Sequence, residues 1–123
     1  MKIAVVTNAD GSISRHFGRA PHYQVFTVED GAITATELRP KPGHDTVIHE
    51  VSAPGQPPLD KHARMIAPVL DCAAVIVGGM GRGGYQALQT AGVRPFVTDM
   101  ADAVAAVQAC IAGTLEDHPE LLH

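Results

Sequence analysis

Short hydrophobic runs, two of them alternating with polar residues, occupy the first forty positions and predict β-strands. The expected strands cover residues 2–7, 23–28 and 32–38. The turn residues Asn8-Ala9-Asp10-Gly11 end the first strand, and Glu29-Asp30-Gly31 separates the other two. We therefore expect a strand, a loop over residues 8–22 without clear periodicity, and a β-hairpin closed by an Asp-Gly turn.

In the second half of the chain, apolar residues recur mostly at helical spacing. Helices are predicted over residues 59–70, about 84–91, and from Met100 to about residue 112, with Asp99 as the cap of the last and Gly92 and Gly113 as helix ends. Pro68 is expected to kink or tighten the end of the first helix. Two further apolar runs, residues 73–77 and 94–98, predict strands, the former central. The inward-facing positions expected on the first and last helices are Leu59, Ala63, Ile66, Ala67, Leu70, Met100, Val104, Val107 and Ile111.

The element order predicts a single α/β domain over residues 1–115. Right-handed crossovers favour a five-stranded mixed sheet of order 3-2-1-4-5, with only the second strand antiparallel and helices on both faces, which is a ribonuclease-H-like three-layer fold. A long Pro- and Gly-containing segment at 39–58 is expected to be an irregular loop, and 116–123 a loose tail. In this order the first and fourth strands are parallel neighbours, so their following loops meet at one edge, where open α/β sheets bind ligands.

Composition narrows the functional classes. The 123 residues are 46% hydrophobic with a net charge of -4, which disfavours a nucleic-acid partner. No apolar run is long enough to cross a membrane, and nothing resembles a signal peptide, so a cytoplasmic protein is expected. Two cysteines 38 positions apart form neither a disulfide framework nor a zinc motif.

Two loops at the predicted strand ends are the candidate binding site. The first contains Ser14, Arg15 and His16, and the second runs through Gly78, Gly79, Met80, Gly81, Arg82 and Gly83. Backbone N–H groups of a glycine loop at a helix N-terminus bind anions, arginines add positive charge, and a thioether or imidazole can ligate a metal. The alternative reading of the glycines is a tight strand-to-helix turn.

The two loops resemble a known family. Ser14-x-His16-Phe17-Gly18-x-Ala20 before a hairpin, and Leu70-Asp71-Cys72 running into Val77-Gly78-Gly79-Met80-Gly81, are similar in order and separation to the nitrogenase iron–molybdenum cofactor biosynthesis family over about residues 1–112. That family includes NifX-like and NafY-like carriers, the C-terminal domain of NifB-type proteins, and the related orange protein. The resemblance implies a ribonuclease-H-like fold and transient binding of an iron–sulfur or iron–molybdenum-type cluster, with His16 as the metal ligand.

The residue types in the sequence limit which cluster-binding or catalytic chemistry the chain can perform. A resident iron–sulfur cubane normally takes four cysteines, and Cys72 and Cys110 are better explained by packing. The chain lacks the CxxxCxxC segment of the catalytic NifB-type enzymes, carries no acid on strands one and four for a nuclease, and has no P-loop ending for nucleotide hydrolysis. His44, His49 and His62 match no standard zinc spacing.

We therefore expect a non-enzymatic carrier that exchanges its cluster with donor and acceptor proteins. The alternatives are a regulatory or interaction module that binds no cluster and, less favoured by the missing acids, a small hydrolase. The sequence leaves open whether the chain forms a homodimer.

Overall fold

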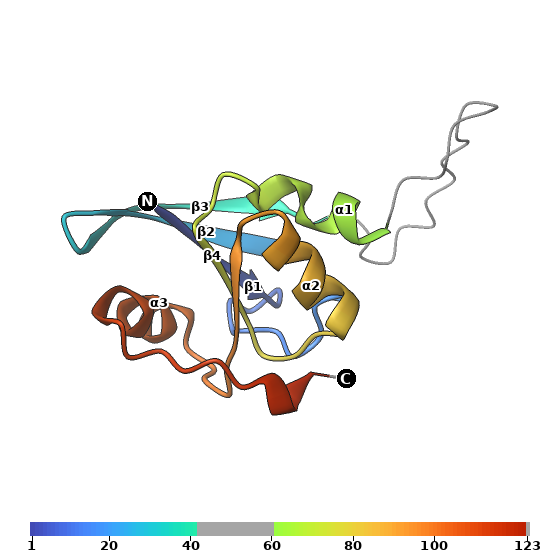
Figure 1. Cartoon of the computed structure of the whole chain (residues 1–123). Coiled ribbons are helices and arrows are strands. Elements are labelled where there is room, and N and C mark those ends of the chain that lie inside the picture. The colour runs from blue at the N-terminus through green and yellow to red at the C-terminus, as the bar shows by residue number, and fades with distance from the viewer. Residues whose placement is uncertain (42–60, 123) are drawn as a thin grey trace.

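Five strands form one mixed sheet in the computed structural model, which describes residues 1–41 and 61–122 (Figure 1). The order is β3-β2-β1-β4-β5, as predicted. β1 runs parallel to β4 and β4 parallel to β5, whereas β2 is antiparallel to both β1 and β3. The strands are β1 (Lys2–Thr7), β2 (His22–Glu29), β3 (Ala32–Pro40), β4 (Ala74–Val77) and β5 (Arg94–Val97).

Helices cover both faces of the sheet, as expected (Figure 1). One face packs against α1 (Lys61–Ile66), which continues into the 3-10 turn η1 (Ala67–Val69), and against α2 (Arg82–Thr90). The other face packs against α3 (Ala103–Ala112). Alternation along β1 separates the two cores, because Ala4 and Val6 face the first and Ile3 and Val5 face the second.

The predicted turns are confirmed by backbone conformation. Asp30 and Gly31 both have positive φ, 51° and 78°, which is the geometry of a type I′ hairpin turn between β2 and β3. Gly92 and Gly113 follow α2 and α3 with φ of 82° and 75°. Glycine adopts this left-handed conformation without a Cβ clash, so both positions end their helices where the sequence places the glycine.

The first helix buries Ile66, as predicted, but exposes Ala63, Ala67 and Leu70, which the sequence also placed inward. Its buried residues are Met65, Ile66 and, in η1, Val69, while Ala63 is exposed and Leu70 is 54% exposed. Pro68 tightens the end of the helix into a 3-10 turn, as expected, and this change of pitch rotates Leu70 away from the sheet. The larger Met65 and Val69 side chains enter the core instead of the smaller alanines.

The last helix begins later than predicted. Asp102, not Asp99, caps it, since its carboxylate accepts from the Val104 amide at 3.0 Å. The segment before it is held by tertiary contacts, because the Ala101 carbonyl accepts from the Ile13 amide at 3.0 Å. Val104 is 44% exposed, against the prediction, and the buried residues are Ala103, Ala106 and Val107, of which Val107 was predicted to face inward.

Residues 116–122, expected to form a loose tail, are held against the domain by hydrogen bonds. Asp117 Oδ1 accepts from the Val97 amide at 2.9 Å, and Asp117 Oδ2 accepts from the Tyr85 hydroxyl. The His118 amide in turn donates to the Val97 carbonyl at 2.8 Å, just before the short 3-10 turn η2 (Pro119–Leu121). These bonds satisfy the outward-facing backbone groups of Val97 on the edge strand β5 and fix the segment against β5 and α2.

Most of the predicted loop at 39–58 lies outside the described residues. Its first two residues, Arg39 and Pro40, belong to β3 instead. His44 and His49 are also outside the described part, as is the side chain of His62, so their metal binding stays untested. Among the described helices, none combines the length and apolar character needed to cross a membrane.

An ion cluster joins the edge strand β3 to the turn before β4. Arg39 donates to the two carboxylate oxygens of Asp71 at 2.7 and 3.1 Å and to the Pro68 carbonyl at 2.7 Å. It also contacts Glu37 at 2.7 Å, and Lys2 lies 3.4 Å from Asp71. The hydrogen bonds from Arg39 hold the pKa of Asp71 well below its usual range.

We expect Asp71→Asn to lower the free energy of unfolding at pH 7 by about 1 kcal/mol or less, because the carboxylate is half exposed. A lowered pKa in the folded state means that the ion pair stabilises the fold above the unfolded pKa, near 3.8, and that this contribution is lost as the pH falls further. The difference between the two proteins should therefore shrink in urea unfolding as the pH falls from about 4 to about 2. A difference that stays constant over this range would contradict the ionic origin.

Candidate functional site

The loop after β1 turns back on itself before reaching the candidate residues. The Asn8 amide donates to the Ser12 carbonyl at 2.9 Å, and the Ser12 hydroxyl and amide both donate to Asp10 Oδ1, at 2.6 and 3.0 Å. These hydrogen bonds lower the pKa of Asp10. The Ser14 amide then donates to the Val6 carbonyl at 2.8 Å, so Ser14 is returned to the C-terminal end of β1.

Ser14 fixes the backbone of the first loop. Its hydroxyl oxygen accepts from the His16 amide at 3.0 Å, and its side chain is 1% exposed. The His16 carbonyl accepts from the Arg19 and Ala20 amides at 3.0 and 3.1 Å. The buried hydroxyl therefore orients His16 through the backbone, while the His16 side chain is exposed.

Two backbone hydrogen bonds join the first loop to the second. The Gly78 amide donates to the Ser14 carbonyl at 2.7 Å, and the Phe17 amide donates to the Gly79 carbonyl at 3.1 Å. A Cβ at residue 78 would lie 2.9 Å from the Ser14 carbonyl oxygen, so only glycine permits this approach. The structure thus brings the two predicted loops together at the C-terminal ends of β1 and β4.

The second loop leads directly into α2. Gly81 is the N-cap residue in an extended conformation, and no side chain caps the helix. Arg82 and Gly83 occupy the exposed first turn. Amide N–H groups at the start of a helix have no partner within it, so this end offers donors and a partial positive charge to an anion.

Met80 and Phe17 pack beneath this turn. Met80 is 1% exposed, and Gly84 leaves room for Met80 Cε and the Phe17 ring, which would lie 3.0 and 3.3 Å from a Cβ at residue 84. The sequence suggests Met80 as a soft thioether ligand, but this burial places its side chain in the core. Phe17, known from the sequence only as part of a motif, holds the first loop against α2.

Lys41 is a residue that sequence reasoning did not select. It is 3% exposed, and its Nζ lies 4.5 Å from the centroid of the Phe17 ring, a cation–π distance. Nothing in its surroundings in the sequence distinguishes it from a solvated loop lysine. Its position depends on the pairing of β3 with β2, which brings residue 41 next to Pro21, whose carbonyl accepts from the Lys41 amide at 3.0 Å.

Positive charge gathers around the joined loops. Arg15, His16 and Arg82 are all exposed. Within residues 1–41 and 61–122, neither Arg15 nor Arg82 has a carboxylate within ion-pair distance. The arrangement can therefore bind an anion through guanidinium groups and backbone amides, and one imidazole is available to a metal.

The cysteines lie away from this site. Cys72 precedes β4 and Cys110 is near the end of α3, at the opposite edge of the sheet from His16. Burial raises the pKa of the Cys72 thiol to about 11 and also raises that of Cys110, so both stay protonated near neutral pH. In the described part of the chain, no three histidine, cysteine or acidic side chains are grouped as a metal site.

The fold and the joined loops define a small α/β domain with a basic, glycine-lined edge. The family profile described as dinitrogenase iron-molybdenum cofactor matches residues 1–113, and the chain belongs to this family. The family is involved in iron–molybdenum cofactor biosynthesis.

The sequence of a relative supports the assignment to this family. The chain is 31% identical over 95 residues to the FeMo cofactor biosynthesis protein NifB of Frankia alni, an alignment that covers 76% of this chain but only 18% of that protein. The chain therefore corresponds to less than a fifth of the length of this relative.

Solved structures share the fold. The apo form of the orange protein from Desulfovibrio gigas matches with a TM-score of 0.70 and 21% identity, covering 95% of this chain and 92% of that one. A Methanocaldococcus jannaschii protein matches with a TM-score of 0.68 and 14% identity, covering 96% and 94%. At these identities the likeness concerns the fold alone.

Proposed function

We propose that this chain binds and carries an iron–sulfur or iron–molybdenum-type cluster, or a precursor of one, at the joined loops. The observation that supports this most directly is the pair of backbone hydrogen bonds between them, Gly78 to Ser14 and Phe17 to Gly79. They place the exposed Arg15 and His16 beside the uncapped start of α2 with Arg82. The ribonuclease-H-like classification of the sheet stays our interpretation of its strand order.

Each part of the site has a role in this proposal. Arg15 and Arg82 attract the anionic cluster, and the amides of the segment Gly79–Gly83, including Gly81, bind its outer atoms. The Gly78 amide is already used in the hydrogen bond to the Ser14 carbonyl. His16 ligates one metal through its imidazole, on a backbone oriented by Ser14. Met80 supports the loop from the core and leaves the ligand role to His16.

Transient binding follows from this small ligand set. One imidazole together with amide and guanidinium contacts is exchangeable, whereas a resident cubane is normally held by four thiolates. The protonated Cys72 and Cys110 at the opposite edge supply none. The cargo would therefore be taken from a donor protein and passed to an acceptor.

The proposed role is non-enzymatic. β1 and β4, where a two-metal nuclease of this topology would need carboxylates, consist of Lys-Ile-Ala-Val-Val-Thr and Ala-Val-Ile-Val. The competing proposal is a regulatory or interaction module that keeps the fold and binds no cluster.

Anaerobic loading separates these two proposals. We expect the wild-type chain to retain molybdenum after desalting when it is mixed with tetrathiomolybdate or with iron–molybdenum cofactor extracted from dinitrogenase. His16→Ala should weaken this binding by at least about tenfold, because it removes a direct metal ligand. Metal analysis and the visible absorption spectrum provide the measurements.

His118→Ala is the matched control, since it removes an imidazole outside both loops whose Nδ1 lies 2.7 Å from Glu120. It should load like the wild type. No uptake by the wild-type chain would refute the carrier proposal, whereas equal uptake by His16→Ala would refute only the ligand role of His16.

A further inference from the structure

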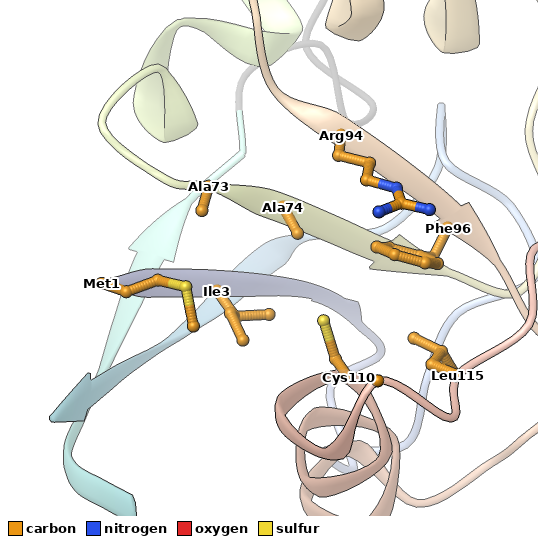
Figure 2. A pocket seen from close by; sticks show the side chains of 9 residues that line it. Met1, Ile3, Ala73, Ala74, Arg94, Phe96, Cys110 and Leu115 are labelled. Atoms are coloured by element: carbon orange, nitrogen blue, oxygen red, sulfur yellow. The ribbon is translucent and has the colours of Figure 1, made fainter. Parts of the chain in front are cut away.

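A separate pocket lies at the edge of the sheet away from the joined loops. It has a volume of about 230 Å³ and opens between the N-terminal ends of β1, β4 and β5 and the C-terminal end of α3. Figure 2 shows the Cys110 sulfur pointing from α3 into the space between Ile3 and Phe96, with Leu115 facing Phe96 from the segment after the helix. Neither of the two joined loops contributes a residue to its lining.

The walls of the pocket are mainly hydrocarbon and uncharged. Ile3 and Phe96 belong to the core on the α3 face, and Leu115 packs against that core. The side chain of Met1 reaches the pocket beside Ile3 (Figure 2). The Cys110 thiol is neutral near pH 7, because burial raises its pKa, so it places no negative charge in the pocket. The interior therefore favours an apolar group.

Arg94 carries the one charged side chain among the residues that line this pocket, while the Met1 ammonium donates to the Val28 carbonyl at 3.0 Å. The guanidinium carbon of Arg94 lies 4.7 Å from the centroid of the Phe96 ring, a cation–π contact that keeps the group at the side of the pocket. Over residues 1–41 and 61–122, Arg94 has no ion pair with a carboxylate. A planar guanidinium without an acidic partner is suited to donate two parallel hydrogen bonds to a carboxylate ligand.

We propose that this pocket binds a small monocarboxylic acid with a branched hydrocarbon tail, the carboxylate on Arg94 and the tail between Ile3, Phe96 and Leu115. A single guanidinium matches one negative charge, whereas a phosphate dianion would need further donors among these apolar walls. A water-sized group takes about 30 Å³, so the pocket has room for about eight such groups. A ligand of about eight non-hydrogen atoms would therefore fill it. This site is independent of the cluster site.

The probe is 4-methylpentanoate, added to the ¹⁵N-labelled full chain and followed by NMR. We expect a dissociation constant on the order of 1 mM. The largest amide shifts should lie at Ile3, Phe96 and Leu115. The uncharged 4-methylpentanamide, which keeps the tail and loses the charge, should bind about tenfold more weakly.

Two substitutions test the contacts. Arg94→Gln should weaken 4-methylpentanoate binding about tenfold. Cys110→Leu should remove binding by filling the pocket. The matched control is Arg15→Gln, which deletes an exposed arginine at the other edge of the sheet and should leave this binding unchanged.

Absence of localised shifts at 20 mM probe would overturn the proposal. Equal binding of the acid and the amide by the wild-type chain would overturn the role of Arg94, and this comparison needs no variant to fold. Binding that is lost in Arg15→Gln but kept in Arg94→Gln would move the anion site to the glycine loops and would also refute the proposal.

Discussion

We expect Gly78→Ala to lower the free energy of unfolding by about 2–4 kcal/mol and to abolish cluster uptake. The added Cβ would lie 2.9 Å from the Ser14 carbonyl oxygen and 3.2 Å from Arg15 Cα, both backbone atoms that cannot rotate away. The first loop would have to move, and its hydrogen bond to the Gly78 amide would be lost. Overpacking and an unpaired buried carbonyl each cost about 1–3 kcal/mol. Urea unfolding and molybdenum retention provide the two measurements.

Gly18→Ala is the control for this prediction. Gly18 belongs to the first loop, which Gly78 contacts, but the nearest atom to its added Cβ would be Met65 Cε at 4.0 Å, an ordinary contact. Its stability and uptake should stay close to the wild-type values. If Gly78→Ala behaves like Gly18→Ala, the close approach of the two loops does not build the site.

Phe17→Ala should lower the free energy of unfolding by about 3–5 kcal/mol, as for other buried phenylalanines. The Phe17 ring is 4% exposed, packs beneath Gly84 at the start of α2, and meets Tyr23 edge to face at 6.4 Å. It also lies under Lys41 Nζ. Because His16 precedes it directly, removal of the ring frees the backbone that orients the imidazole. Cluster uptake per folded molecule should therefore fall as well.

Phe26→Ala separates the two effects. Phe26 is 1% exposed and belongs to the core on the α3 face, away from both loops. We expect a similar loss of stability but unchanged uptake per folded molecule, measured below the unfolding transition. Equal loss of uptake in both variants would indicate that stability alone, and not the position of the first loop, controls binding.

Local signals in the sequence were sufficient to predict the strand order and the contact between the two loops. The Asp30-Gly31 turn specifies a hairpin because both residues tolerate positive φ, and the apolar run before Gly78 specifies a central strand. Given right-handed crossovers, these two elements place β1 beside β4. The loops that follow them then share one edge, so their proximity could be predicted.

Which helix side chains are buried was harder to predict from the sequence. Periodicity indicates that a helix has a buried face, but it does not say where the last turn of the helix tightens. Pro68 predicts a tightened helix end, but the exposure of Leu70 depends on the 3-10 geometry of that turn. α3 is capped by Asp102 and not by the predicted Asp99, because the Ala101 carbonyl accepts a hydrogen bond from the Ile13 amide, in a distant part of the chain.

The sequence by itself determined the sheet, its turns and the meeting of two glycine loops, because these depend on backbone conformation and short-range pattern. The tertiary structure decided which side chains at that meeting point remain available. It buries Met80, bonds Ser14 to the backbone of His16, places Lys41 Nζ over the Phe17 ring and docks Asp117 onto β5. Each of these depends on contacts between residues far apart in the chain, which a local pattern does not encode.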